Sequence, residues 1–194
     1  MFTTLDDVRR DVADRLIRGA KDRKVPMHSP VVVTSDVDAR VMVLRDFDRS
    51  TWTLRFHTDA RAPKAKVIAA DPQMAVLLYD KGAKIQIRAK GIGRIEQSGP
   101  VADAAWNDAT NFARRCYLGD GPGSASVAPT SGLPDWAEGI QPTDEQIAPA
   151  RENFAVLLIE LQQIDWLYLA NSGHQRAQFA RGDGSDWSGN WVTP

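Results

Sequence analysis

The stretch PVVVTSDVDARVMVLRDFDRSTWTLRFHT, residues 30–58, decides the fold. It holds three short runs rich in β-branched or aromatic residues, PVVVTSD, ARVMVLRDF and TWTLRFHT. The turn-like segments SDVDA and DFDRS separate them. Runs of this length and composition between turn residues predict strands joined as antiparallel hairpins.

The strand pattern continues beyond this stretch. MAVLLYD (74–80) and AKIQIRAKGIGRI (83–95) predict two more strands with a turn at Lys81-Gly82, and the second alternates apolar and polar residues. AVLLIELQQIDWLYLA (155–170) predicts two strands or one bent strand. The alternating order of a doubly wound parallel sheet is absent. The expected fold is therefore mainly β (α+β), an antiparallel barrel of about six to eight strands with helical additions.

Three or four helices are expected around these strands, the fourth a short helix capped by Thr143. Residues 4–20 show helical spacing of apolar side chains, and Thr4 with Asp7 forms a capping pair. PKAKVIAADP predicts a short helix that ends before Pro72. A helix over 101–117 is expected to carry Cys116 on its apolar face, where buried packing is the simplest role.

The chain is expected to form a single domain over residues 1–194, with an N-terminal helical segment over 1–25. Residues 118–142 are rich in Gly, Pro and Ser and predict a long loop. Such a loop inside a compact domain is often functional, and the alternative is a disordered surface segment.

The charge balance limits the possible partners. Twenty-four Lys and Arg against 25 Asp and Glu give a net charge of -1, which does not favour bulk nucleic-acid binding. One cysteine and three well-separated histidines give no zinc spacing, so no metal is expected. Neither a signal peptide nor a membrane-spanning run is evident, and we expect a cytoplasmic protein without a membrane partner.

Hydrolase and nucleotide-loop motifs are absent. The sequence has no GxSxG, HExxH or GxxxxGK[ST] motif. Gly91-Ile92-Gly93 lies within a strand pattern, which is not the place of a dinucleotide fingerprint.

What remains is a set of cationic and polar side chains near strand ends. Guanidinium groups, a lysine and a hydroxyl are suitable donors for a phosphate, and a helix starting near Pro63 would add backbone N–H groups. The alternative is a solvated sheet edge blunted by charge. The residues concerned are Arg40, Arg45, Thr58, Arg61, Lys64, Gln86 and Arg88.

Four motifs in order resemble the pyridoxamine 5'-phosphate oxidase-like, FMN-binding split-barrel family. They are RVMVLR (40–45), FHTDARAPKA (56–65), IQIRAKG (85–91) and WLYLANSGHQR (166–176). The resemblance runs from about residue 30 to the end of the chain. It implies a six-stranded antiparallel Greek-key split barrel with flanking helices, and a homodimer with FMN at the interface.

The resemblance also implies roles for single residues. Arg40 and Lys64 would bind the FMN phosphate, and Gln86 would contact the edge of the flavin ring. Pro63 stands where the family has a further arginine, and Arg61 is the candidate substitute. The implied cofactor-binding residues are Arg40, Val41, Met42, Val43, Leu44, Arg45, His57, Thr58, Arg61, Lys64, Gln86, Trp166 and Arg176.

Two departures concern the substrate site of pyridoxamine phosphate oxidase itself. Ser172 replaces the arginine that precedes the motif histidine, here His174. Of a Tyr, Arg and Ser set, the chain offers Asn111, Arg115 and Gly119. The flavin site is thus retained and the pyridoxamine phosphate site is degraded, and His174 and Arg115 remain the candidates for a catalytic role.

The expected function is that of an FMN-dependent oxidoreductase, an oxidase or reductase acting on a small molecule. A non-catalytic flavin-binding module, such as a carrier or sensor, is one alternative. Pyridoxamine 5'-phosphate oxidase with an altered substrate site is another.

Overall fold

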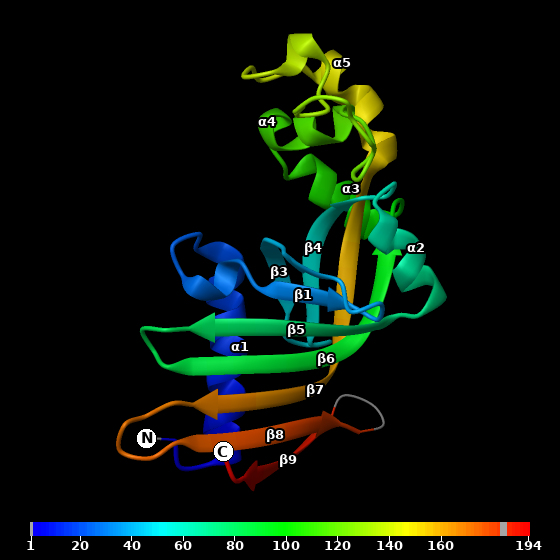
Figure 1. Ribbon diagram of the computed structural model, residues 1–194. Coiled ribbons are helices and arrows are strands. Elements are labelled where there is room, and N and C mark those ends of the chain that lie inside the picture. The colour runs from blue at the N-terminus through cyan, green and yellow to red at the C-terminus, as the bar shows by residue number, and fades with distance from the viewer. Residues whose placement is uncertain (1, 183–185) are drawn as a thin grey trace. The chain divides into compact units, whose positions relative to one another are not determined.

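The computed structural model describes residues 2–182 and 186–194. Figure 1 shows the elements along the chain. In chain order they are α1 (Leu5–Lys21), η1 (Pro26–His28), β1 (Val31–Thr34), β2 (Ala39–Val41), β3 (Leu44–Asp48), β4 (Thr53–Asp59), α2 (Pro63–Ala70), β5 (Gln73–Asp80), β6 (Ile85–Glu96), α3 (Pro100–Asn107), α4 (Asn111–Arg114), η2 (Arg115–Leu118), η3 (Asp135–Ala137), α5 (Asp144–Ile147), η4 (Ala148–Asn153), β7 (Phe154–Tyr168), β8 (Gln175–Arg181) and β9 (Trp187–Val192).

The chain divides into two compact units. Unit 1 comprises Met1–Phe56, Asp71–Gly93 and Leu158–Pro194, and unit 2 comprises His57–Ala70 and Arg94–Leu157. The strands β4, β6 and β7 each contain a boundary between the units. A single domain over the whole chain stays a prediction.

The strands form a sheet in the order β2-β1-β5-β6-β7-β4-β3, with β8 paired to β7 and β9 paired to β8. The pairs β1–β2, β3–β4 and β5–β6 are antiparallel, as the sequence pattern predicts. The pairs β7–β8 and β8–β9 are antiparallel as well, although the sequence pattern predicts no strand for β8 or β9. The expected fold class, mainly antiparallel β with flanking helices, is confirmed.

The strand count exceeds both the six to eight strands expected from the pattern and the six implied by the resemblance, since the described residues form nine strands. The run ARVMVLRDF is one reason, because it changes partner at Met42: β2 pairs with β1, whereas β3 pairs with β4. The Met42 N–H donates to the Pro30 carbonyl at 3.0 Å, and the β3–β4 register shifts between Leu44 and Asp46. The tail adds the other strands, β8 and β9.

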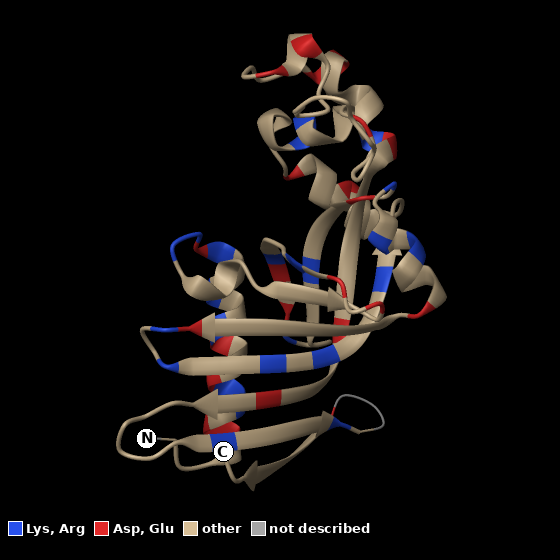
Figure 2. Ribbon diagram, viewed as in Figure 1, with Lys and Arg blue, Asp and Glu red and all other residues tan. Residues whose placement is uncertain are grey.

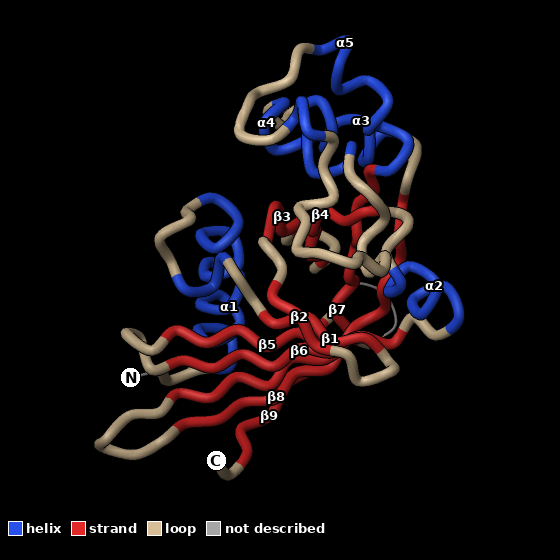
Figure 3. Tube along the Cα trace, turned by 45° about the horizontal axis from the view of Figure 1, so that its top comes forward, coloured by secondary structure: helices blue, strands red, loops and turns tan. Residues whose placement is uncertain are grey.

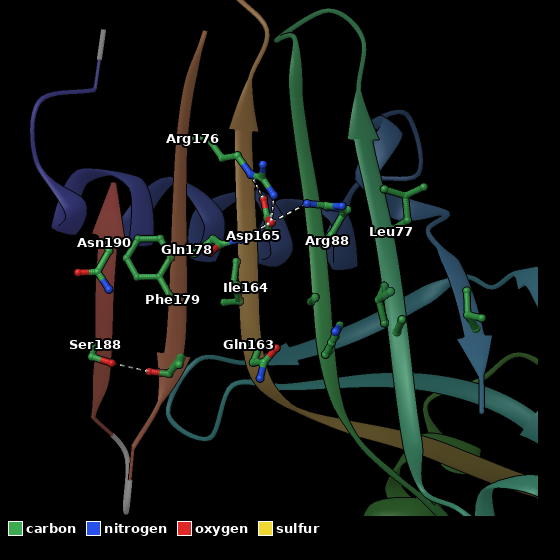
Figure 4. Close-up of a pocket in the computed structure, with 16 residues that line it drawn as sticks. Leu77, Arg88, Gln163, Ile164, Asp165, Arg176, Gln178, Phe179, Ser188 and Asn190 are labelled. Atoms are coloured by element: carbon green, nitrogen blue, oxygen red, sulfur yellow. Dashed lines mark hydrogen bonds and ion pairs between the residues drawn. The ribbon is translucent and has the colours of Figure 1, made fainter. Parts of the chain in front are cut away.

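Helix α1 packs its apolar stripe on one face of the unit 1 sheet and runs behind the strands in Figures 1 and 4. The capping box between Thr4 and Asp7 starts it as predicted. Val8, Val12 and Leu16 are buried at helical spacing. The helix therefore closes one side of the sheet.

The other face of the unit 1 sheet carries exposed side chains. Along β6 the buried residues alternate with exposed ones such as Arg88 and Lys90, as predicted from the sequence. On the neighbouring β5, Leu77 is 38 % exposed and Tyr79 is 46 % exposed. This face combines apolar surface with charge.

Unit 2 contains short helices joined by loops (Figure 3). The expected continuous helix over 101–117 is wrong, because α3 ends at Asn107 and Thr110 caps a new helix by accepting from the Ala113 N–H. Cys116 lies in η2 and is exposed, so the expected burial of this residue is also wrong. A competing N-cap overrides the apolar spacing here.

The 118–142 segment is a loop, as predicted, with one short 3-10 turn, η3. Its first part lies beside the start of α2. Arg61 Nη2 donates to the Gly119 carbonyl at 3.0 Å, and a Cβ on Gly121 would lie 3.6 Å from Arg61 Cβ. A Cβ on Gly123 would meet the Pro63 ring at 3.5 Å. The loop therefore contacts the stretch predicted to bind phosphate.

Candidate functional site

Unit 1 has a hollow of about 680 Å³ on the open face of its sheet, called here the sheet-face hollow. Strands β1 and β5 to β9 contribute to it, and Figure 4 shows its lining side chains. Its apolar surface includes Val33, Ala75, Leu77, Ile164 and Phe179. Its polar side chains are Arg88, Lys90, Gln163, Asp165, Arg176, Gln178, Ser188 and Asn190.

Asp165 on β7 is the centre of the polar part of this hollow. Its Oδ1 accepts from Arg176 Nε at 3.0 Å, and its Oδ2 accepts from Arg176 Nη2 at 2.7 Å. Oδ2 also accepts from Arg88 Nη2 at 2.6 Å and from Gln178 Nε2 at 2.9 Å. One carboxylate therefore links side chains of β6 and β8 across β7 (Figure 4).

The environment of Asp165 keeps it ionised. Burial by itself raises the pKa of this carboxyl, but hydrogen bonds from Arg176, Gln178 and Arg88, with the charge of Arg88, outweigh burial and lower the pKa to about 2. The Asp165 hydrogen bond in turn raises the pKa of Arg176. Asp165 and Arg176 are therefore both charged at neutral pH.

The hollow carries a positive balance. Arg88, Lys90 and Arg176 are cationic, against Asp165 as the acidic residue of its lining. Figure 2 shows the basic positions on β6 beside an acidic position on β7. Cations above an apolar surface favour a ligand that joins a flat apolar part to an anionic group.

Arg40 on β2 lies in a second polar group of unit 1. Both of its terminal nitrogens donate to Thr34 Oγ1 at 3.1 Å, and it forms an ion pair with Asp38. Thr34 is buried and donates to Asp36 Oδ1 at 2.6 Å, and this bond lowers the pKa of Asp36. The guanidinium is thus positioned near its strand end, as the sequence predicts, but two acidic residues surround it.

The rest of the first motif spans the change from β2 to β3. Val41 is 66 % exposed and Leu44 is fully buried, whereas Met42 and Val43 are half-buried. Arg45 is exposed at the register shift. Gln86, half-buried on β6, lies opposite Tyr79 of β5 and two residues before Arg88 of the hollow.

Unit 2 holds the second motif. Arg61 forms a two-point ion pair with the buried carboxylate of Asp59, with Nε to Oδ1 at 3.0 Å and Nη2 to Oδ2 at 2.7 Å, and this bond raises the pKa of Arg61. Thr58 is buried, and the His57 ring meets the Phe154 ring edge-on at 5.1 Å. Lys64 is half-buried in the first turn of α2.

Trp166 and Arg176 of the fourth motif differ in accessibility. The Trp166 side chain is fully buried, packs edge-on to Phe2 at 4.7 Å and donates to Asp11 Oδ2 at 3.3 Å. A flavin contact by this indole would require that aromatic packing to open. Arg176 lines the sheet-face hollow. Both roles stay predictions.

The two catalytic candidates lie in different units. His174 is exposed in the turn between β7 and β8. Arg115, in η2, donates to the carbonyls of Ala137 at 3.4 Å and Ile140 at 3.0 Å, and it stacks on Phe112 at 4.0 Å. Arg115 is therefore engaged in holding unit 2 together.

Apart from Arg176, sequence reasoning missed the residues of β7, β8 and β9 that face the hollow. Asp165 and Gln178 lie opposite each other in the β7–β8 register, and Asn190 lies opposite Gln178 in β8–β9. The alternation of polar and apolar residues along QIDW (163–166) and RAQF (176–179) was a usable signal for the faces. The pairing itself was not, because register is a tertiary property.

Residues 26–97 match the model of the family described as pyridoxamine 5'-phosphate oxidase, FMN-binding domain. This confirms the resemblance drawn from the sequence motifs over the matched residues, and the matched domain indicates FMN as the cofactor. No curated protein matches the sequence.

Solved structures share the fold. A pyridoxamine 5'-phosphate oxidase-related, FMN binding protein from Nostoc punctiforme PCC 73102 is 23% identical with a TM-score of 0.72, and both chains are covered completely. PhzG from Burkholderia lata 383, in complex with tetrahydrophenazine-1-carboxylic acid, is 15% identical with a TM-score of 0.64 over 98% of this chain and 92% of its own. At these identities the likeness establishes the split-barrel fold.

The donor set of the chain fits FMN. The hollow offers apolar surface with Arg88, Lys90 and Arg176, and the predicted phosphate residues Arg40 and Lys64 are a guanidinium and an amine. Within residues 2–182 and 186–194, no cluster of acidic, histidine or cysteine side chains could hold a metal ion. Over the same residues, no helix combines the length and apolar character needed to span a membrane.

Proposed function

We propose that this protein is an FMN-dependent oxidoreductase that acts on a small molecule. The observation that carries the proposal is the FMN-binding domain match over residues 26–97. The positively charged, partly apolar sheet-face hollow supports it. The fold likeness to PhzG is consistent with it but does not identify a substrate.

In this proposal the chain's own residues bind and orient the cofactor. Arg40 and Lys64 bind the phosphate, with Thr58 as a neutral donor and Arg61 as the substitute for the missing arginine. Gln86 contacts the edge of the flavin ring. When bound, FMN supplies the hydride-accepting ring, and the protein supplies orientation and electrostatics.

We further propose a homodimer in which the open sheet face meets a second copy. Leu77 and Tyr79 leave apolar surface exposed on that face, and their burial would be favourable. Arg176 would then contact the flavin held by the partner, together with the partner-facing Arg88. A cytoplasmic location remains part of the same proposal.

A visible absorption spectrum tests the cofactor, and anaerobic reduction tests turnover. The purified protein, loaded with FMN and desalted, should retain about one flavin per subunit. Bound flavin should then bleach with a small amine, an alcohol, NADH or NADPH. A protein that keeps no flavin contradicts the cofactor assignment, and a flavin that no such reductant bleaches contradicts the enzyme assignment.

A flavin-binding module without turnover is the second candidate. It is favoured by Ser172 at the substrate-arginine position and by the structural engagement of Arg115 with the Ala137 and Ile140 carbonyls. Tight FMN retention without reduction by any tested donor would support it. Formation of pyridoxal 5'-phosphate from pyridoxamine 5'-phosphate would instead support the third alternative, and we expect none.

A further inference from the structure

We propose that Asp165 is a positioning residue for the flavin site, which fixes the guanidinium of Arg176 in the orientation that receives the flavin nucleotide. The inference rests on the proposed function, in which Arg176 contacts FMN. None of the sequence motifs includes Asp165, and its role follows from the geometry of the sheet-face hollow.

The contact between Asp165 and Arg176 determines an orientation as well as a distance. Both carboxylate oxygens bind the same guanidinium, one at Nε (3.0 Å) and one at Nη2 (2.7 Å). Two parallel hydrogen bonds fix the plane of the guanidinium, whereas a single bond would leave it free to rotate. The remaining nitrogen, Nη1, contacts the Thr193 carbonyl at 3.5 Å.

Asp165 is itself held from both neighbouring strands. Arg88 of β6 and Gln178 of β8 both donate to its Oδ2, and the side chain is 16% exposed. In the register, Gln178 lies opposite Asp165, while Arg176 lies opposite Leu167 and reaches Asp165 diagonally. A carboxylate fixed from two sides can orient Arg176 before a ligand arrives, which lowers the entropy cost of binding.

If Asp165 acted only as a charge, its removal would change FMN binding in the direction opposite to that expected for a positioning residue. Asp165 is an anion among Arg88, Lys90 and Arg176, so as a countercharge it would weaken the binding of an anionic ligand. Its removal would then strengthen FMN binding. If Asp165 positions Arg176, its removal weakens binding, and the sign of the change separates the two roles.

The first experiment is the dissociation constant of FMN, measured by flavin fluorescence, for the wild type and Asp165→Ala. We expect about tenfold weaker binding in the variant, the size of a lost hydrogen bond to a charged group. Asp165→Glu, which keeps the charge and both acceptors, should restore most of the affinity. Glu160→Gln is the matched control, since Glu160 is also on β7 and pairs with Arg181 of β8 at 2.6 Å but does not line the hollow.

A double-mutant cycle tests whether Asp165 acts through Arg176. In the Arg176→Ala background, Asp165→Ala should cause no further loss of FMN affinity. An equal loss in both backgrounds overturns the inference, because Asp165 would then act on the fold or on another residue. If circular dichroism shows that Asp165→Ala does not fold, Asp165→Asn enters the same cycle in its place.

FMN binding by the wild type and by Asp165→Ala separates the positioning role of Asp165 from the proposed function. A wild type that does not bind FMN refutes the proposed function, and the inference with it. A wild type that binds FMN, with an Asp165→Ala variant that binds equally or more tightly, overturns the positioning role alone. A loss confined to the background that contains Arg176 supports it.

Discussion

Arg40–Asp38 and Arg176–Asp165 are both ion pairs between a guanidinium and a carboxylate, but their surroundings differ. Arg40 pairs with Asp38, whose side chain is 67% exposed, next to the buried Thr34. Asp165 is mostly covered and binds side chains from two strands. Asp38 is thus the more exposed of the two carboxylates, and under the proposed function the FMN phosphate replaces it on Arg40, whereas Asp165 is held from two strands.

Arg40→Ala and Lys64→Ala should each weaken FMN binding by about 1–3 kcal/mol, because each removes a charged donor to the phosphate. Fluorescence titration with FMN measures the change. Arg49→Ala is the control, since Arg49 is half-exposed and meets Asp14 at 3.9 Å. Unchanged affinity in both variants would remove the phosphate assignment.

Asp165 should also give an acid-dependent contribution to stability. Its folded pKa, about 2, lies below the ordinary value of 3.8, so its contribution is present above about pH 4 and is lost as the pH falls toward 2. Wild type should exceed Asp165→Asn in free energy of unfolding by about 1–2 kcal/mol at pH 6. Urea denaturation at pH 6 and pH 2.5 measures the free energy of unfolding of both proteins. A difference between them that does not shrink at pH 2.5 contradicts the proposed contribution of the ionised Asp165.

At the scale of elements, local capping patterns determine where a helix begins, whereas tertiary contacts determine whether a helix continues or breaks. The capping boxes at Thr4 and Thr143 form as their spacing suggests. The helix expected over 101–117 breaks because Thr110 caps a second helix. Apolar spacing alone does not reveal such a break, since the competing cap depends on where the chain turns.

Gly91 on β6 lies close against the backbone of β7. A Cβ on Gly91 would lie 2.4 Å from the Glu160 carbonyl oxygen, so a larger residue must push the strands apart. Gly91→Ala should lower the free energy of unfolding by about 1–3 kcal/mol. Thermal and urea denaturation measure it, with Gly82→Ala in the β5–β6 turn as the control, because a Cβ there meets only Asp80 Oδ1 at 3.4 Å. Equal stability of both variants would show that the strands can separate without cost.

At the scale of the whole molecule, the open face of the unit 1 sheet is the surface on which the proposed flavin contact and the proposed homodimer depend. It combines the sheet-face hollow with the exposed Leu77 and Tyr79, while α1 packs on the opposite face of the same sheet. The hollow is formed within unit 1, so its description does not depend on unit 2. The homodimer proposal concerns this surface.

Leu77→Asp should convert the proposed dimer to a monomer, because it places an unpaired charge in the apolar part of that face. Light scattering after size-exclusion chromatography measures the mass, and FMN titration measures the linked loss of affinity. Val127→Asp is the control, since Val127 is fully exposed in the 118–142 loop. A wild type that is monomeric at micromolar concentration would contradict the dimer.

The sequence by itself determined the hairpins up to β6, the capped N-terminal helix, the long loop and the three motifs that lie within the FMN-binding domain match over residues 26–97. These are local patterns of period, turn residues and caps, and they act over a few neighbouring residues. Only the tertiary structure decided that ARVMVLRDF divides between two partners and that Asp165 joins Arg88, Arg176 and Gln178. Both depend on strand register and pairing, which join residues far apart in the chain and leave no local signal in either segment.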